Sequence, residues 1–386
     1  MKKKILVLGC TGSIGTSTLK IIESFSDRFE VTGLSAHTNP AGLIEAGRKF
    51  NCKNLCLSGS KTADSSIKYS GQDGLKQLIK ECNADIAVNG IAGSAGLLPS
   101  VWVLENGIDL ALANKETIVM AAPLVYKIAE VAGKQILPVD SEHSAVFSLI
   151  NKYGRNSVSK IILTASGGPF RKFTKEQLNS VTVEDALKHP TWNMGKKITI
   201  DSATLANKGL EVIEACRLFD VTPDNVKVTV HPQSLVHSLI ETKDGILYGQ
   251  ISKPDMRHPI MQALFWPDFT ENNLEKLDLS SFLTSSPLEM TFAGANTELF
   301  PMLKLAYSAA EKNGGYTIAY NAANEIAVQA FADKKIGFYG ISEITEKTLQ
   351  HDWTHEPKSI DEVMQIDKEA RLLAENVLQS ITKKDV

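Results

Sequence analysis

The N-terminal segment alternates between short apolar runs and a helix-like stretch, and a glycine-rich turn joins the first run to that stretch. Residues 4–9, KILVLG, have the continuous apolar character of a fully buried strand, and residues 29–36, FEVTGLSA, predict a second strand. Between them, residues 16–25 carry apolar side chains at helical spacing. This order predicts a parallel sheet, because parallel strands need a crossover connection. A ligand of such a sheet binds at the carboxyl ends of the strands.

The alternation continues to about residue 140, after which strand-rich segments and then helical segments follow. Residues 197–200, KITI, are among the predicted strands, and residues 234–252 predict a hairpin that turns at Lys243–Gly245, so the second sheet is partly antiparallel. The predicted fold class is therefore α/β. We expect an N-terminal Rossmann-like dinucleotide domain at 1–130, a second α/β domain at 131–265, a linker at 266–290 and a C-terminal helical bundle at 291–386.

Composition narrows the class of partners. The net charge of −3 offers no basic field for nucleic acid, and no run of 18 apolar residues is present to span a membrane. The five cysteines are few and odd in number, which favours a reducing compartment over a disulfide framework. The N-terminus lacks the apolar core and cleavage site of a signal peptide. We expect a cytoplasmic protein with a small-molecule partner.

The turn GCTGSIG places glycines at positions 9, 12 and 15, after a strand and before a helix. Glycines let the backbone approach a pyrophosphate, and the helix N-terminus supplies N–H groups and a favourable dipole. The turn therefore predicts a dinucleotide site, although a tight turn without a ligand has the same glycines. The second strand ends in Ala36, His37, Thr38 and Asn39, with no carboxylate for a ribose 2′-hydroxyl, which favours NADP over NAD.

Two carboxylates and an imidazole crowd into the stretch VDSEHS, where Asp140, Glu142 and His143 stand. If the preceding strand continues through Glu142, both carboxylates point to one side and suit Mg²⁺ or Mn²⁺. The alternative is the start of a helix, capped by Asp140 or Ser141, with Glu142 favoured by the helix dipole.

A second polar cluster lies on the predicted helix of residues 201–215. Asn207 and Glu211 are four residues apart and share a face, so Glu211 is a candidate third ligand, unless it only pairs with Lys208. Ser166 and Ser202 add hydroxyls that could bind a phosphate or serve ordinary turns.

The loop at 186–197 has no apolar periodicity yet carries Trp192 and Met194, which predicts a lid over a ligand or, alternatively, a loop anchored by a buried tryptophan. His237 alone would fit a core histidine on a strand.

Six motifs in this order closely resemble the 1-deoxy-D-xylulose 5-phosphate reductoisomerase family: GCTGSIG, LANKET, VDSEHSA, TASGGPF, HPTWNMGKKITIDSATLANKGLEVIEA and HPQSLVHS. The resemblance extends through NAANE at 321–325. It implies an enzyme that isomerises 1-deoxy-D-xylulose 5-phosphate and reduces the product with NADPH to 2-C-methyl-D-erythritol 4-phosphate, for non-mevalonate isoprenoid synthesis. It also implies a homodimer with a catalytic second domain and a divalent cation (Mn²⁺, Mg²⁺ or Co²⁺).

The resemblance assigns roles to matching positions. The metal ligands are Asp140, Glu142 and Glu211, and the catalytic residues are Lys115, Glu142, His143, His189, Glu211 and His237. The substrate contacts are Lys115, Ser141, Glu142, Ser166, His189, Trp192, Ser202, Asn207, Lys208 and Glu211. The cofactor contacts are Thr11, Gly12, Ser13, Ile14, Ala36, His37, Thr38, Asn39, Asn114, Glu116, Met194 and Gly195. Retro-aldol cleavage with realdol joining and an α-ketol shift are both routes proposed for such enzymes.

Two other classes fit parts of the sequence. A metal-independent NAD(P) dehydrogenase would share the glycine turn, and a dinucleotide-sensing module would need neither the carboxylates nor the lid. The carboxylates, the phosphate-type cluster and the lid loop favour the metal-dependent enzyme.

The second strand tip generates a prediction about cofactor choice. The family often carries a lysine at this tip, whereas here His37 and Thr38 stand, so a 2′-phosphate loses one charge-assisted contact. We expect NADPH to be preferred over NADH by a narrower margin than a tip lysine would give. Steady-state kinetics with both cofactors measures this margin, and equal kcat/KM values would contradict the preference.

Overall fold

The computed structural model describes residues 1–59, 64–192, 194–280 and 288–383. The chain forms two compact units. The first unit contains Met1–Ile118, Ala122–Ser144 and Asp255–Glu271, and the second contains Val119–Ala121, Ala145–Pro254 and Asn272–Val386.

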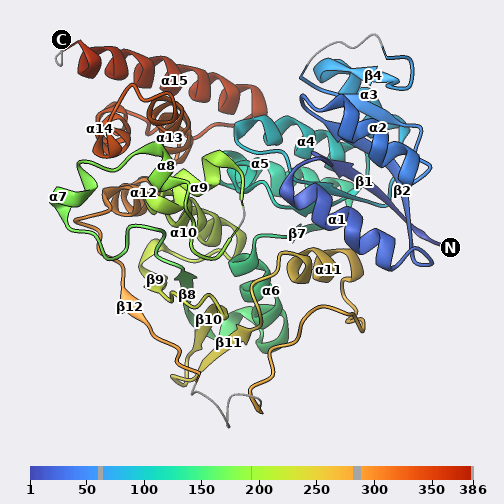
Figure 1. The fold of residues 1–386 in the computed structure, drawn as a ribbon, viewed down its shortest axis with the longest axis horizontal. Helices are drawn as coiled ribbons and strands as arrows, with labels where there is room; N and C mark the ends of the chain where they lie inside the picture. The colour runs from blue at the N-terminus through green and yellow to red at the C-terminus, as the bar shows by residue number, and fades with distance from the viewer. Residues whose placement is uncertain (60–63, 193, 281–287, 384–386) are drawn as a thin grey trace. The chain divides into compact units, whose positions relative to one another are not determined.

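The first unit is built on a seven-stranded sheet with the order β4-β3-β2-β1-β5-β6-β7, in which every strand pair is parallel (Figure 1). Its strands are β1 (Lys3–Leu8), β2 (Phe29–Ala36), β3 (Leu55–Leu57), β4 (Tyr69–Ser70), β5 (Ile86–Asn89), β6 (Asp109–Leu112) and β7 (Ile136–Pro138). The strand order reverses at β1, because β2 lies on one side of it and β5 on the other. Such a reversal leaves a crevice at the carboxyl ends of the two central strands. The predicted Rossmann-like sheet is confirmed.

Helices connect these strands and cover the sheet. They are α1 (Ser13–Ser24), α2 (Pro40–Lys49), α3 (Gly71–Glu81), α4 (Leu97–Glu105), α5 (Lys115–Ala132) and α11 (Arg257–Phe265). Helix α11 comes from far along the chain and packs on α1. The ring of Phe265 meets those of Phe25 and Phe29 edge-on, with centroids 5.0 and 4.8 Å away, and Lys3 Nζ donates to the Leu264 carbonyl. The core of the first unit is therefore completed by residues that lie more than a hundred positions after its last strand.

The second unit contains a five-stranded sheet of order β11-β10-β8-β9-β12. Its strands are β8 (Val158–Ala165), β9 (Val226–Val230), β10 (Val236–Thr242), β11 (Leu247–Ile251) and β12 (Ala293–Gly294). Strands β8 and β9 are parallel, and the other pairs are antiparallel. The predicted hairpin is present as β10 and β11, with the Gly245 N–H donating to the Thr242 carbonyl at the turn.

Helices make up the rest of the second unit. They are α7 (Lys175–Leu178), α8 (Val183–Ala186), α9 (Lys196–Ala203), α10 (Ala206–Leu218), α12 (Pro301–Lys312), α13 (Tyr316–Ala332), α14 (Phe338–Leu349) and α15 (Ile360–Thr382). Helix α6 (Ser141–Tyr153) begins in the first unit and continues in the second. Helix α13 packs on both α14 and α15, and the buried Tyr320 hydroxyl donates to the Met302 carbonyl. The predicted C-terminal helical bundle is confirmed (Figure 1). Within the described residues, each helix is too short or too polar to cross a bilayer.

Two local predictions differ from the structure. Residues 197–200 are helical within α9 and not a strand, because Thr199, Ile200 and Ala203 form one buried helix face and Lys197 pairs with Asp201 one turn later. Strand β7 ends at Pro138 and α6 begins at Ser141, so the carboxylates of the VDSEHS stretch do not alternate along a strand. The domain bounds at 130, 265 and 290 stay a prediction, and the predicted linker and lid include residues 281–287 and 193, which lie outside the described residues.

Candidate active site

The glycine turn follows β1 and opens α1, as the sequence predicts. Gly9 has φ of +77°, and its N–H donates to Ser35 Oγ at 3.1 Å. Gly12 is the N-cap of α1 and makes no side-chain cap, so the first N–H groups of the helix remain available. A Cβ on Gly15 would lie 2.3 Å from the Gly9 carbonyl oxygen, so only glycine fits. Residues Thr11–Ile14 are exposed or half-buried at this helix start, where free N–H groups and the helix dipole favour an anion.

The tip of β2 is open and polar. Ala36 is buried at the strand end, whereas His37, Thr38 and Asn39 are exposed. The Asn39 carboxamide oxygen caps α2 by accepting from the Gly42 N–H at 2.9 Å. His37 Nδ1 lies 3.3 Å from Ser58 Oγ. The tip offers hydrogen-bonding groups and no carboxylate.

Asn114 fixes the turn that follows β5. It is the N-cap of α5 and accepts from the Thr117 N–H at 3.0 Å. Its amide donates to the carbonyls of Ile91 and Gly93, both at 2.8 Å, and to the Glu116 carboxylate at 3.0 Å. The buried Asn114 side chain therefore holds this turn beside the glycine turn, because β5 is paired with β1.

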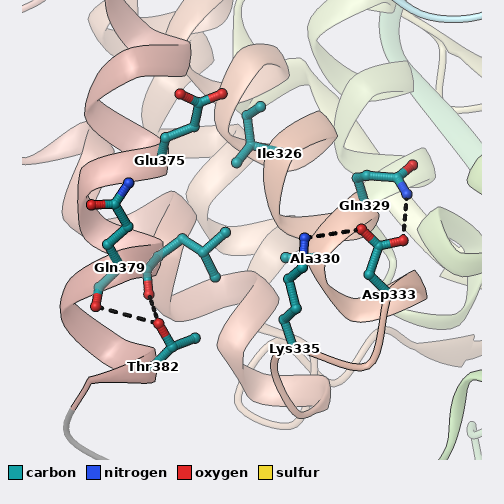
Figure 2. A pocket seen from close by; sticks show the side chains of 9 residues that line it. Ile326, Gln329, Ala330, Asp333, Lys335, Glu375, Gln379 and Thr382 are labelled. Atoms are coloured by element: carbon teal, nitrogen blue, oxygen red, sulfur yellow. Dashed lines mark hydrogen bonds and ion pairs between the residues drawn. The ribbon is translucent and has the colours of Figure 1, made fainter.

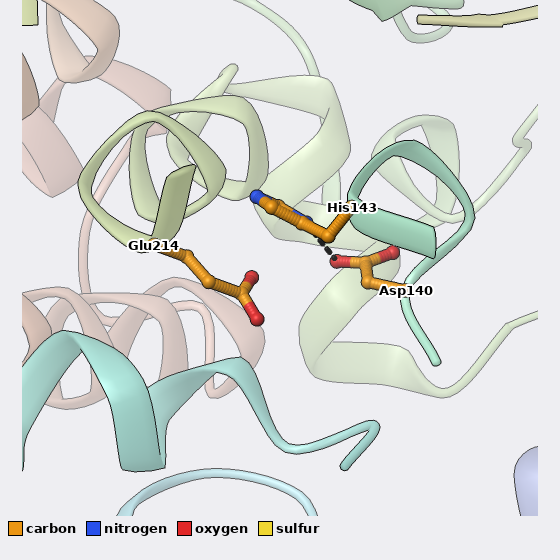
Figure 3. Close-up of side chains that lie close together, drawn as sticks. All are labelled: Asp140, His143 and Glu214. Atoms are coloured by element: carbon orange, nitrogen blue, oxygen red, sulfur yellow. Dashed lines mark ion pairs between the residues drawn. The ribbon is translucent and has the colours of Figure 1, made fainter. Parts of the chain in front are cut away.

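Charged side chains gather at the carboxyl ends of β6 and β7. These ends are adjacent because Leu112 pairs with Pro138. Lys115, only 5% exposed, places Nζ 2.5 Å from Asp140 Oδ2. His143 Nδ1 lies 3.8 Å from the same oxygen (Figure 3). The first unit thus brings together three of the residues that the sequence singled out.

Helix α6 begins inside this cluster. The Asp140 carboxylate accepts from the Ser141 N–H at 3.1 Å, and the Ser141 hydroxyl donates to the Glu142 carboxylate. Glu142 lies in the first turn, where the helix dipole favours negative charge. The alternative prediction, that this stretch starts a helix, is correct for the local structure. It leaves both carboxylates at the strand ends, with Lys115 balancing part of their charge.

In the second unit, Ser166 and His189 meet just after β8. Ser166 Oγ lies 3.1 Å from His189 Nε2. His189 Nδ1 accepts from the backbone N–H groups of Thr191 and Trp192 at 3.2 and 2.9 Å, so Nε2 carries the proton and donates to Ser166. Burial, and secondarily the positive charge of Arg171, lowers the pKa of His189 to about 4. The imidazole is neutral at physiological pH and acts as an N–H donor.

Two glycines shape the turn that carries Ser166. Gly167 and Gly168 have φ of +81° and +65°, a region that residues with a Cβ rarely occupy. A Cβ on Gly168 would lie 2.8 Å from the Ser202 carbonyl oxygen, so the turn lies directly against α9. The structure therefore places the turn that follows Ser166 against the backbone of Ser202.

Helix α10 holds a buried ionic cluster. Asn207 donates to the Glu211 carboxylate at 2.5 Å, and the Lys208 ammonium pairs with the same carboxylate. Lys208 and Glu211 are 4% and 1% exposed, so each needs the other as a counter-charge. Glu211 therefore pairs with Lys208, which was the alternative to a metal-ligand role. The two roles are compatible, because a carboxylate has two oxygens.

The predicted lid carries its tryptophan toward β10. The rings of Trp192 and His237 approach edge-on with centroids 6.5 Å apart, and His237 Nε2 lies 3.1 Å from the Ser252 carbonyl oxygen. Met194 and Gly195 follow and lead into α9, of which Gly195 is the N-cap. His237 is therefore a buried strand histidine that also faces the loop.

Several polar residues near the candidate site were not predicted from the sequence. Arg171 donates to the Gly168 carbonyl at 3.3 Å and thus brings a positive charge to the serine–glycine turn. Asp201, 1% exposed, accepts from Lys197 and from Asn324, both at 2.8 Å. Glu214 projects from α10 and is 1% exposed (Figure 3). These residues could have been found in the sequence as polar side chains within otherwise apolar helical stretches, as Asn324 is in NAANE.

A separate pocket of about 400 Å³ lies between α13 and α15, where Gln329 and Lys335 both donate to Asp333 (Figure 2). Its other lining residues are Ile326, Ala330, Glu375, Leu378, Gln379 and Thr382. It contains none of the predicted site residues, so it is not the candidate active site.

Comparison with known families agrees with the motifs. A model described as 1-deoxy-D-xylulose 5-phosphate reductoisomerase matches residues 5–122, and the model of the C-terminal domain of that enzyme matches residues 136–219. A further model, the DXP reductoisomerase C-terminal domain, matches residues 251–373.

Individual proteins match over nearly the whole chain. The 1-deoxy-D-xylulose 5-phosphate reductoisomerases of Treponema denticola and Chlorobium chlorochromatii are 47% and 44% identical, each over 97% of this chain and over 96% and 100% of their own lengths. The Zymomonas mobilis enzyme solved with NADPH superposes with a TM-score of 0.89 at 41% identity, covering 98% of this chain and 100% of that one. A DOX-P reductoisomerase solved with NADPH, fosmidomycin and magnesium gives 0.89 at 35% identity, covering 98% and 99%.

The lowered pKa of His189 generates a prediction about stability. An unfolded histidine titrates near 6.5, so between pH 6.5 and about 4 the unfolded chain binds a proton that the folded chain excludes. The free energy of unfolding should therefore fall as the pH drops through this window. After allowance for partial exposure, we expect His189 to contribute on the order of 1 kcal/mol.

Urea unfolding of the wild type and His189→Asn at pH 7 and pH 4.5 measures this contribution. The variant should lose less stability on acidification than the wild type. His351→Asn, which changes an exposed histidine outside the loop, controls for the loss of a titratable side chain. An equal loss in wild type and His189→Asn would contradict the prediction.

Proposed function

Because the chain belongs to the 1-deoxy-D-xylulose 5-phosphate reductoisomerase family, we propose that the residues gathered at its strand ends divide the work of that reaction among them. The protein is an oxidoreductase that uses NADPH and a divalent metal ion to isomerise and reduce 1-deoxy-D-xylulose 5-phosphate to 2-C-methyl-D-erythritol 4-phosphate. This is a step of non-mevalonate isoprenoid synthesis. The observation that supports this function most strongly is the sequence identity of more than 40% to two enzymes of the family over 97% of the chain.

NADPH binds at the crevice beside β1 in this proposal. The glycine turn fits a pyrophosphate, because Gly15 allows close packing and the uncapped α1 N-terminus presents N–H groups. The tip residues Ala36–Asn39 receive the ribose phosphate. Asn114 and Glu116 shape the neighbouring turn, and Met194 and Gly195 border the nicotinamide.

The donor set for the metal ion consists of hard carboxylate oxygens from Asp140, Glu142 and Glu211, which fits Mg²⁺, Mn²⁺ or Co²⁺. When bound, the ion supplies a Lewis acid that stabilises negative charge on substrate oxygens. Lys115 and Lys208 hold Asp140 and Glu211 in place before it binds.

The phosphate group of the substrate is bound by Ser166, Ser202, Asn207 and Lys208. Ser202 and Lys208 supply a hydroxyl and an ammonium, and neutral His189 donates through Nε2 to Ser166, which leaves the Ser166 hydroxyl proton for the phosphate. Because burial keeps this imidazole neutral at physiological pH, it serves Ser166 as an N–H donor. Arg171 adds positive charge at the rim of the same turn.

The reacting carbon skeleton lies near Lys115 and Ser141, which hydrogen-bond its hydroxyl groups. Trp192 closes over the substrate and excludes water. His143 and His237 line the pocket and are the candidates for holding a proton. We also propose that the protein is a homodimer and works in the cytoplasm, as the composition and the family suggest.

The direct test is a coupled absorbance assay. We expect 1-deoxy-D-xylulose 5-phosphate to drive NADPH oxidation in the presence of Mg²⁺ or Mn²⁺, and chelator to abolish it because the carboxylates alone cannot stabilise the substrate oxyanion. Absence of NADPH oxidation with either ion would refute the proposed function. Full turnover after exhaustive chelation would instead point to a metal-independent dehydrogenase.

Replacing one proposed ligand should separate metal binding from cofactor binding. Glu211→Gln keeps the shape of the side chain and removes its charge, so we expect metal affinity and kcat to fall by about tenfold or more. NADPH affinity should stay within about twofold, because the glycine turn is unchanged. Calorimetric titration with Mn²⁺ and NADPH fluorescence measure the two affinities.

Glu325→Gln is the matched control for that experiment. Glu325 pairs with Arg371 at 2.6 Å on α13, so its replacement also breaks a largely buried ion pair, but outside the site. It should lower stability and leave Mn²⁺ affinity unchanged. If Glu211→Gln behaves in the same way, Glu211 is structural and not a ligand.

A further inference from the structure

Strand β10 contains a strained residue beside a candidate active-site histidine. Ser238, completely buried, has φ of +82°, which side chains with a Cβ rarely adopt. The pairing register between β10 and β11 shifts between Val236 and Leu239, so His237 and Ser238 lie in a β-bulge. A strained backbone persists only where its surroundings hold it, and such residues concentrate at functional sites.

The side chain of Thr164 holds this bulge. Its hydroxyl donates to the Val236 carbonyl at 2.7 Å and accepts from the Ser238 N–H at 3.1 Å. It therefore bridges the residues on either side of His237. Thr164 is 4% exposed, so water does not compete for these two bonds.

The backbone and the serine itself provide little else. The ladder between β10 and β8 covers Leu239 to Thr242 only, so the Thr164 hydroxyl takes the place of ladder bonds at the bulge. Within the part of the chain that the structure describes, the Ser238 hydroxyl has no hydrogen-bond partner. The pairs of Val236 with Ile251 and of Leu239 with Gly249 flank the bulge on the β11 side, and on the β8 side the Thr164 hydroxyl holds it, without help from the Ser238 hydroxyl.

The bulge determines the direction in which His237 points. A bulge re-aims the side chains of its residues relative to a regular strand. Here His237 is 6% exposed, its Nε2 lies 3.1 Å from the Ser252 carbonyl oxygen, and its ring and that of Trp192 meet edge-on. Thr164 lies on β8 two residues before Ser166, which directly follows the strand, so one segment positions both His237 and the serine proposed to bind phosphate.

We propose that Thr164 is a positioning residue, whose hydroxyl fixes the bulge that holds His237 against Trp192 of the lid loop. This inference rests on the proposed function for the role of His237 and Trp192 at the substrate. Thr164 itself is buried, and its hydroxyl is engaged by the backbone of Val236 and Ser238. Its contribution is to keep the His237 ring in the orientation in which it meets Trp192.

Thr164→Val tests the proposal, because valine keeps the shape and β-branching of threonine and removes the hydroxyl. We expect kcat/KM for 1-deoxy-D-xylulose 5-phosphate to fall by about 10- to 100-fold, as a small misplacement of a site residue produces. The loss should appear mainly in kcat, and KM for NADPH should be unchanged. Thr164→Ser retains the hydroxyl and should recover activity to within about threefold.

Thr242→Val is the matched control, on strand β10, which pairs with β8. Its hydroxyl also lies within hydrogen-bond distance of two groups, but at the hairpin end of β10: it donates its one proton to the Asp244 carboxylate at 2.5 Å or to the Ile246 carbonyl at 3.0 Å. It should lower thermal stability without changing kcat/KM. A loss of activity as large as that of Thr164→Val would show a general effect of strand stability and overturn the proposal.

A second measurement does not depend on turnover. The ring Cε1–H signal of His237, assigned with His237→Asn, should shift in Thr164→Val and not in Thr242→Val. If the wild type fails to oxidise NADPH, the proposed function fails while this signal still tests the position of the ring. An unmoved His237 signal with wild-type kinetics in Thr164→Val would overturn the inference alone.

If Thr164→Val does not fold, the double variant Thr164→Val with Ser238→Gly replaces it, because glycine adopts the positive φ without strain. Compared with Ser238→Gly alone, the double variant should show the same loss of kcat and the same shift of the His237 signal. Equal kinetics and equal signals in these two proteins would refute a positioning role for Thr164.

Discussion

The parallel arrangement of the first sheet is the constraint on which the first half of the site depends. All its strands run in one direction, so every strand delivers its following loop to the same edge. The glycine turn after β1, the turn held by Asn114 after β5, and the charged residues after β6 and β7 therefore share one edge. The order of strands decides which of these loops are neighbours. A cofactor crevice and a carboxylate cluster arise from the same geometric rule.

Buried charge is handled in a consistent way in both units. Asp140 is paired with Lys115, Asp201 with Lys197, and Glu211 with Lys208. An isolated buried carboxylate would be expensive, so each acidic group has its own ammonium group before any ligand binds. For Asp140 and Glu211, this arrangement orients the carboxylates. Loss of one lysine would leave a buried charge without its counter-charge, which costs more than the pair itself contributes.

Much of the fold was predictable because local pattern and tertiary context agree. Strand β2 was predicted with its observed bounds, and the hairpin of β10 and β11 turns where Asp244 and Gly245 indicate. The prediction of a strand at residues 197–200, KITI, was wrong, because it relied on the strand propensity of β-branched residues. Burial of one helical face and the pairing of Lys197 with Asp201 determine a helix instead.

The site was predictable in its residue types but not in its hydrogen bonds. Carboxylates, serines and a lysine at characteristic spacing, with the family resemblance, located the candidates. The tautomer of His189 was not predictable, since it depends on two backbone N–H groups of a loop without periodicity. The hydrogen bonds from Thr164 to β10 join residues that are 72 and 74 positions apart in the sequence, and a local sequence pattern cannot predict contacts of that separation.

The return of the chain to the first unit has a consequence for synthesis and for fragment design. Helix α11 packs on α1, and Phe265 covers Phe25 and Phe29. A nascent chain that ends after β7 therefore exposes these aromatic rings until α11 leaves the ribosome. An expressed fragment that stops before residue 255 would keep the same apolar surface uncovered and be prone to aggregate. The dinucleotide-binding unit is consequently not an autonomous N-terminal module, and its maturation must wait for most of the sheet of the second unit to be translated.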